Sequence, residues 1–305
     1  MALELRGSVA EEIVKIAEKV GMDPETYLRH VLAKVKRKKK KIEYLPLKGK
    51  AEIAKTVARY GLSFFKNPAI IWSGGKDSTL VLWFAKLAAE ELGKKIGDYK
   101  VLLIDHFMHF EETFEFMDKV AEDWGFKWEA VGTEELKGYK YGEEVEVASL
   151  PEELRKELEK IGYNKPTFPF ALNNIAGNHL LKTVALKRAI ARMKLDAVFI
   201  GIRWDENPAR ADETFFSPRE EPRHFRVHPI LLFTERDVWD YTLRNKLPIH
   251  PLYKKGYRSL DDKYETKKVS DKPAWEQDLE TTEERFGRAQ DKEQIMELLR
   301  KFGYM

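Results

Sequence analysis

The chain has 305 residues, of which 43% are hydrophobic and 34% charged, with a formal net charge of +3. This length predicts about two domains, or one large domain with appendages. The absence of cysteine excludes disulfides, thiolate zinc sites, cysteine-ligated iron–sulfur clusters and a thiol nucleophile. No stretch approaches the ~18 apolar residues of a membrane span, and the amino-terminal stretch has no apolar export core. We therefore expect a cytoplasmic protein, and its abundant Lys and Glu are also typical of thermophilic proteins.

The first 45 residues are predicted to form a helical basic extension. Ser8 and Glu11 have the spacing of a capping box, and a second helix starting near Pro24 runs into a basic run from Lys34 to Lys41. Such a run can bind the phosphate backbone of a nucleic acid. It can equally be a solvated helix end, where cations suit the helix dipole.

Short apolar runs alternate with longer amphipathic segments from residue 46 to about 250. Strands are predicted at 69–72, 100–105, 127–131 and 197–200, and helices at 51–65, 77–92, 111–124 and 173–193, with residues 46–49 as a joint and Pro151 opening a surface helix. This alternation predicts an α/β fold, with a parallel sheet sandwiched between helices in a Rossmann-like arrangement. Residues 251–305 are then expected to form an irregular carboxyl-terminal tail that contacts a substrate or partner.

The strongest local signal is a glycine loop placed after a predicted strand and before a predicted helix. It contains Ser73, Gly74, Gly75, Lys76, Asp77 and Ser78. Glycines let the backbone approach an anion, and the following helix directs unpaired N–H groups at it. Lys76 adds a cation, and Asp77 can cap the helix or help to hold Mg²⁺. The spacing differs from a Walker loop, and an ordinary glycine turn with a capped helix is the alternative interpretation.

A second polar group follows the predicted strand at 197–200. Gly201, Arg203 and Arg210 lie just beyond its end, where an open parallel sheet binds its ligand. The two arginines can clamp oxyanion oxygens with paired donors, or they can form surface ion pairs with Asp205 and Glu206. Lys182 lies on the helix that precedes this strand.

The string SGGKDS resembles the pyrophosphate-binding loop of the PP-loop, or adenine-nucleotide alpha-hydrolase, superfamily, whose members cleave ATP between the alpha and beta phosphates. The resemblance implies that Asp105 lies beside the nucleoside, although Asp105 can instead cap the strand end. The order of the later motifs, from Gly201 through Tyr257-Arg258-Ser259 to Thr281-Thr282-Glu-Glu284, resembles the phosphoadenosine phosphosulfate reductase family. Its sister group, the small subunits of two-subunit sulfate adenylyltransferases, is more similar still, and the resemblance covers about residue 67 to the carboxyl terminus.

This resemblance implies ATP as cosubstrate, with Mg²⁺, and adenylyl transfer to an oxyanion acceptor such as sulfate, because the reductases need a cysteine that this chain lacks. It implies that the glycine loop cradles the beta and gamma phosphates. Lys76, Lys182, Arg203 and Arg210 would supply catalytic charge, Gly201 would bind ATP, and Arg258 with Ser259 would contact substrate from the tail. A GTPase partner subunit is implied in the same way.

Other functions stay open at this point. One is a different cysteine-free adenylyl transfer on the same fold, for instance to flavin mononucleotide, and another is a reductase-like protein without the catalytic cysteine. A nucleic-acid-associated ATP-binding protein would use the basic run from Lys34 to Lys41. A catalytically silent ATP-binding regulator would keep the loop but not the turnover.

Overall fold

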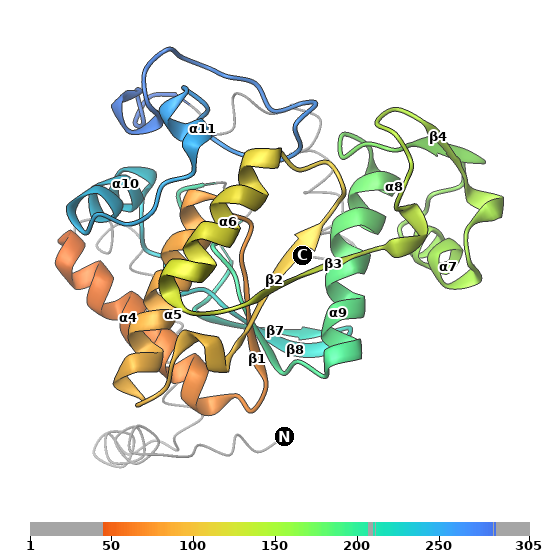
Figure 1. Ribbon diagram of the computed structural model, residues 1–305. Helices are drawn as coiled ribbons and strands as arrows, with labels where there is room; N and C mark the ends of the chain where they lie inside the picture. Colours follow the sequence, from red (N-terminus) through yellow and green to blue (C-terminus); the bar gives the residue numbers. More distant parts are fainter. Residues whose placement is uncertain (1–44, 207–209, 211, 283, 285–305) are drawn as a thin grey trace.

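A twisted six-stranded sheet forms the centre of the protein in the computed structural model, which describes residues 45–206, 210, 212–282 and 284 (Figure 1). Its strand order is β3-β2-β1-β6-β8-β7. The strands are β1 (Pro68–Ile71), β2 (Lys100–Asp105), β3 (Trp128–Gly132), β6 (Ala197–Phe199), β7 (Phe216–Glu220) and β8 (Arg223–Val227). Neighbouring strands are parallel except for β7, which pairs antiparallel with β8. The predicted parallel α/β sheet is confirmed, and the β7–β8 hairpin is an addition that the sequence did not predict.

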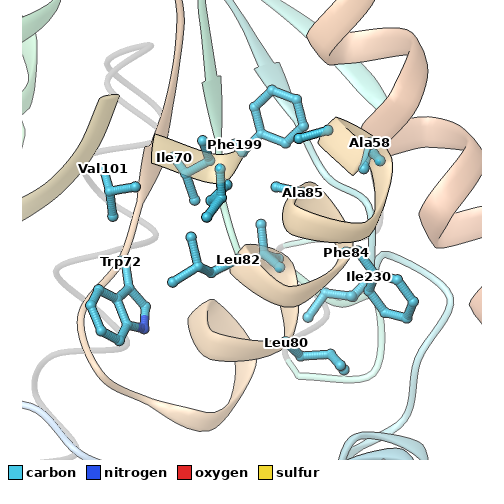
Figure 2. Packing of buried hydrophobic residues seen from close by; sticks show 14 of the residues in the cluster. Ala58, Ile70, Trp72, Leu80, Leu82, Phe84, Ala85, Val101, Phe199 and Ile230 are labelled. Atoms are coloured by element: carbon cyan, nitrogen blue, oxygen red, sulfur yellow. The ribbon is translucent and has the colours of Figure 1, made fainter. Parts of the chain in front are cut away.

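Successive residues of the strands pack against helices on opposite faces of the sheet, as the period of two in a strand requires. Ile70, Val101 and Phe199 pack with α4, α5 and α6 in the largest buried cluster, part of which Figure 2 shows. Their neighbours Ala69 and Val198 pack with α9 on the other face. The helices are α4 (Leu47–Phe64), α5 (Lys76–Glu91), α6 (Glu111–Trp124), α9 (Ala185–Met193) and α10 (Glu235–Arg244). Both faces of the sheet are therefore covered.

A smaller layer with its own buried cluster lies beside α9, on the right in Figure 1. It is built from α7 (Glu152–Lys160), α8 (Ile175–Asn178) and the antiparallel pair β4 (Glu144–Glu146) and β5 (Thr167–Pro169). The helix predicted to open at Pro151 is α7, so that prediction is confirmed. Short helices complete the described chain: η1 (Ile96–Asp98), η2 (Glu134–Leu136), η3 (Val147–Ser149), α11 (Pro251–Lys254) and η6 (Ala274–Glu276).

Two predicted helices differ from the structure by more than a one-residue shift at an end. Residues 47–49, expected in a joint, are helical, because α4 begins at Leu47 directly after Pro46; proline suits this place since its fixed φ and missing N–H match a helix start. The helix predicted over 173–193 is continuous, but its middle turns, η4 (His179–Val184), are π-helical. No helix among the described residues is long and apolar enough to cross a membrane. The predicted basic extension lies outside the described residues, apart from its last residue, Leu45.

Candidate anion-binding site at the glycine loop

The glycine loop lies at the switch point of the sheet. Strand β1 pairs with β2 on one side and with β6 on the other, so the loops that follow β1 and β6 diverge at the carboxyl edge, where ligands bind in open α/β sheets. The two loops touch at Gly201. A Cβ atom there would lie 2.9 Å from the Asp77 carbonyl carbon and 3.0 Å from the Ser78 nitrogen. Only glycine permits this approach, so the sequence brings the two predicted loops together.

The loop itself is held by local hydrogen bonds. Gly74 has a φ of +72°, a left-handed conformation that glycine adopts without steric cost. The Ser73 N–H donates to Ser78 Oγ at 3.2 Å, and Ser78 Oγ–H donates to the Gly75 carbonyl at 3.0 Å. Helix α5 begins at Lys76, so its first N–H groups have no partner within the helix. The loop and the helix start therefore form a preorganised cradle for an anion.

A buried group of four charges lies over this cradle. Lys76 Nζ is 2.9 Å from Asp77 Oδ2, and Arg203 Nε is 3.2 Å from Asp77 Oδ1. The fourth member is Glu284 from the carboxyl-terminal tail, whose two carboxylate oxygens contact Lys76 and Arg203 separately. Arg203 is fully buried and the Lys76 side chain is 2% exposed. One carboxylate thus bridges the two cations that the sequence assigned to phosphate binding.

The electrostatics of this group favour an anion. Burial opposes ionisation of Glu284, but the charges of Arg203 and Lys76 outweigh it and lower its pKa to about 2. Burial likewise disfavours the cation of Lys76, while Asp77 and Glu284 raise its pKa above the ordinary value. The Nη1 atom of Arg203 is buried and has no hydrogen-bond partner among the described residues. The site therefore pairs its two cations with the carboxylates of Asp77 and Glu284 and keeps one unbonded donor on Arg203.

The tail that carries Glu284 is fastened to the domain by Arg258. This buried guanidinium lies 2.8 Å from Glu235, which begins α10, and it donates to the carbonyls of Asp278 and Thr282 at 2.9 and 3.0 Å. Arg258, predicted to contact substrate from the tail, bonds the tail itself within the described residues, and its predicted substrate contact stays a prediction. Ser259 beside it is buried as well.

Other predicted site residues lie outside the four-charge group. Lys182 forms an ion pair with Asp261 at 2.6 Å. Asp105 accepts a hydrogen bond from the Phe107 N–H at 2.7 Å, the strand-end cap that the sequence left as an alternative. Arg210 Nε lies 3.9 Å from the Glu206 carboxylate. Their predicted roles stay predictions.

Two contributors to the site were missed from the sequence. Tyr253 accepts a hydrogen bond at its hydroxyl from the Lys76 N–H, 2.9 Å away, and Glu284 bridges the cations. Both positions belong to the motifs that carried the family resemblance. Their contacts span 177 and 208 residues of chain, so no local pattern pointed to them.

The residues at the loop suit Mg²⁺ only together with a phosphate ligand. Asp77 Oδ1 is buried, makes no hydrogen bond among the described residues and lies 3.2 Å from Arg203 Nε, so a bound Mg²⁺ would have to replace this ion pair. No group of three or more His, Cys, Asp or Glu suited to a metal ion occurs in the described part of the chain. Mg²⁺ commonly takes one or two carboxylates and completes its shell with phosphate oxygens and water. Asp77 fits that use.

A parallel sheet with a glycine loop and paired buried cations at its switch point defines the class: an α/β protein built to bind an anion there. The profile of the family described as phosphoadenosine phosphosulfate reductase domain matches residues 67–268, and the chain belongs to this family. Sulfate adenylyltransferase subunit 2 of Brucella anthropi is 29% identical over 219 residues, which cover 64% of this chain and 62% of that protein. The Rhizobium meliloti protein of the same name is 27% identical, covering 65% and 64%. The chain thus spans less than two thirds of the length of these relatives.

Solved structures support the fold alone. Yeast FAD synthetase in complex with FAD superposes with a TM-score of 0.53 at 14% identity, covering 85% of this chain and 99% of that one. Candida glabrata FMN adenylyltransferase gives 0.52 at 13% identity, covering 84% and 95%. The Rossmann-like α/β prediction and the predicted family resemblance are both confirmed.

Proposed function

We propose that this chain transfers the adenylyl group of ATP to an oxyanion, with sulfate as the acceptor. The observation that carries the proposal is the bridging of Lys76 and Arg203 by the Glu284 carboxylate, since a site that binds a carboxylate on two buried cations suits a phosphate equally well. Relatives called sulfate adenylyltransferase subunit 2 support sulfate as the acceptor. The chain contains no cysteine, so the thiol chemistry of a reductase would have to come from elsewhere.

In the proposed reaction a sulfate oxygen attacks the alpha phosphorus in line. A bond forms between this sulfate oxygen and the alpha phosphorus. At the same time the bond breaks between the alpha phosphorus and the oxygen that bridges it to the beta phosphate, and pyrophosphate leaves with the electron pair of the broken bond. The loop N–H groups and Lys76 hold the beta and gamma phosphates, and Arg203 neutralises charge near the alpha phosphate. Mg²⁺, held by Asp77 and the phosphates, would supply further charge neutralisation. Positioning and charge neutralisation supply most of the acceleration in such transfers.

The remaining residues and partners take proposed roles. Asp105 would lie beside the nucleoside, and Lys182, Arg210, Arg258 and Ser259 would act on the acceptor side. The name "subunit 2" of the relatives supports a second subunit, which we propose to be a GTPase. The division into residues 1–45, 46–250 and 251–305 is kept as a proposal. Nucleic-acid binding by the basic run from Lys34 to Lys41 concerns residues outside those described.

Incubation of the intact chain with ATP labelled in the alpha phosphate tests the proposal. Sulfate and flavin mononucleotide are offered as acceptors, each with and without the GTPase subunit, and the labelled product is identified. We expect labelled adenylyl sulfate and an equal amount of pyrophosphate with sulfate. Lys86→Ala should give the same products as the unaltered chain, because Lys86 lies on the same helix as Lys76 but pairs with Glu90. Labelled FAD instead of adenylyl sulfate, or no adenylylated product in any arm, would refute sulfate as the acceptor.

A further inference from the structure

A pocket away from the glycine loop is lined by residues of α9, the adjoining η4 and the β7–β8 hairpin. Helix α9 and η4 supply Thr183, Lys187 and apolar side chains, and the hairpin supplies Arg219, His224 and Arg226. None of the pocket residues belongs to the four-charge group at the loop. The role of this pocket therefore follows from the contacts of its own residues.

Arg226 is the cation in this pocket that makes no close ion pair, although the more distant Glu213 carboxylate attracts it. Lys187 lies 3.3 Å from Glu157, and Arg219 lies 2.7 Å from Glu213, whereas Arg226 forms no ion pair within 4.0 Å in the described structure. Its Nε is buried without a hydrogen-bond partner among the described residues, and so is the Nε of Arg219. Two guanidinium groups thus keep unsatisfied N–H donors at one pocket.

No other polar group of the pocket neutralises Arg226. His224 lies with its Nδ1 2.6 Å from the Pro222 carbonyl oxygen, and burial lowers its pKa to about 4, so the imidazole is neutral at pH 7 and brings no charge. Glu220 and Glu221 line the pocket as well, but both are exposed, and water screens their charge. Burial, together with the charge of Arg219, lowers the pKa of Arg226 to about 10, so this guanidinium remains positive at neutral pH.

A half-buried cation without a close ion pair is costly unless an anion joins it. Each guanidinium presents fixed N–H donors whose spacing matches two oxygens of a tetrahedral oxyanion. We propose that the pocket between α9 and the β7–β8 hairpin binds phosphate or sulfate, a small tetrahedral dianion, on Arg226 and Arg219. The proposal is independent of the adenylyl-transfer reaction, because it needs neither ATP nor the glycine loop.

The test separates this pocket from the loop by working in the Lys76→Ala background. Thermal unfolding and calorimetric titration of the full chain are measured with potassium phosphate, potassium sulfate and potassium chloride at equal ionic strength. We expect phosphate and sulfate to raise the melting temperature above that in chloride. Adding Arg226→Gln should weaken their binding at least about tenfold, the loss expected for one charged hydrogen-bonding partner. Arg223→Gln is the matched control, because Arg223 lies on the same strand, is exposed and does not line the pocket.

A purely structural Arg226 would behave differently. If the pocket is an oxyanion site, Arg226→Gln in chloride is at least as stable as its parent, because it removes an unpaired cation. Arg226→Lys keeps the positive charge but lacks the paired N–H donors of a guanidinium, so it should retain part of the affinity for phosphate and sulfate. The proposal is overturned if Arg226→Gln binds phosphate and sulfate as its parent does. It is equally overturned if neither anion binds in the Lys76→Ala background, or if Arg226→Gln melts far lower in chloride.

Discussion

Replacing Glu284 by glutamine should make pyrophosphate and ATP bind more tightly. The carboxylate of Glu284 occupies both cations of the loop site, so a phosphate that binds there must first displace it. Its pKa falls from 4.5 to about 2 in the folded protein, a difference worth about 3 kcal/mol in favour of the ionised side chain. A neutral glutamine lacks this attraction to the two cations and is easier to displace. A change of about 3 kcal/mol sets an upper limit of roughly 100-fold on the gain in affinity for pyrophosphate or ATP.

The same substitution should lower the stability of the ligand-free protein. Above pH 4.5 the ionised carboxylate contributes its full stabilisation, which is lost as the pH falls through about 2. At pH 7 Glu284→Gln therefore leaves Lys76 and Arg203 undercompensated, and we expect the free energy of unfolding to fall by up to about 3 kcal/mol. Tighter ligand binding in a less stable protein is the signature of a displaced internal anion.

The assay is a calorimetric titration of the full chain with pyrophosphate at pH 7, paired with urea unfolding without ligand. Glu280→Gln is the control, because Glu280 lies on the same tail segment, is exposed, and has its carboxylate 3.6 Å from Arg236. We expect a gain of tenfold or more for Glu284→Gln and no change for Glu280→Gln. Equal pyrophosphate affinity, within twofold, in wild type and Glu284→Gln would show that the carboxylate does not compete for the site.

The remaining predictions concern the loop, its neighbour and the response to acid. Lys76→Ala should abolish pyrophosphate release while circular dichroism shows a folded chain; unchanged release would remove Lys76 from the site. Arg203→Ala should cost about 3 kcal/mol in kcat/KM, as loss of a charge-stabilising donor does, and a loss under twofold would leave it a structural role. Gly201→Ala should weaken ATP binding in a titration, because its Cβ would collide with the Asp77 backbone; wild-type affinity would contradict that packing. Burial lowers the pKa of His250 to about 4, so the unfolding free energy should fall between pH 6.5 and 4, and His250→Gln should make that fall shallower.

The local parts of the fold were predictable because their signals are local. The apolar run of β2 matches its predicted bounds at Lys100–Asp105. The glycine loop was found because its glycines, cation and hydroxyls are contiguous. The sequence also placed Gly201 and Arg203 beyond a strand end, and the parallel sheet then brought them beside the loop.

The unpredicted parts depend on partners far away in the chain. Strand β7 contains Pro218 and two charged residues, so it lacks the alternation of a half-buried strand and reads as a loop. Its backbone pairing with β8 makes it a strand, although its own composition does not favour one. Glu284 is one acid in a highly charged tail, and nothing nearby in the sequence marks it as the partner of Lys76 and Arg203.

The π-helical turns of η4 (His179–Val184) make this helix sensitive to length. A π-turn accommodates one residue more than an α-turn, so deleting a single residue there would let α8, η4 and α9 continue as one regular helix. The extra residue is taken up inside the wide turn, so after the deletion α8 and α9 would keep their relative orientation, and the side chains of the turn itself would be redirected. Lys182 would then leave Asp261, 2.6 Å away at present, while the helix itself stayed intact. A one-codon deletion could in this way redirect the side chains above the sheet without unfolding it.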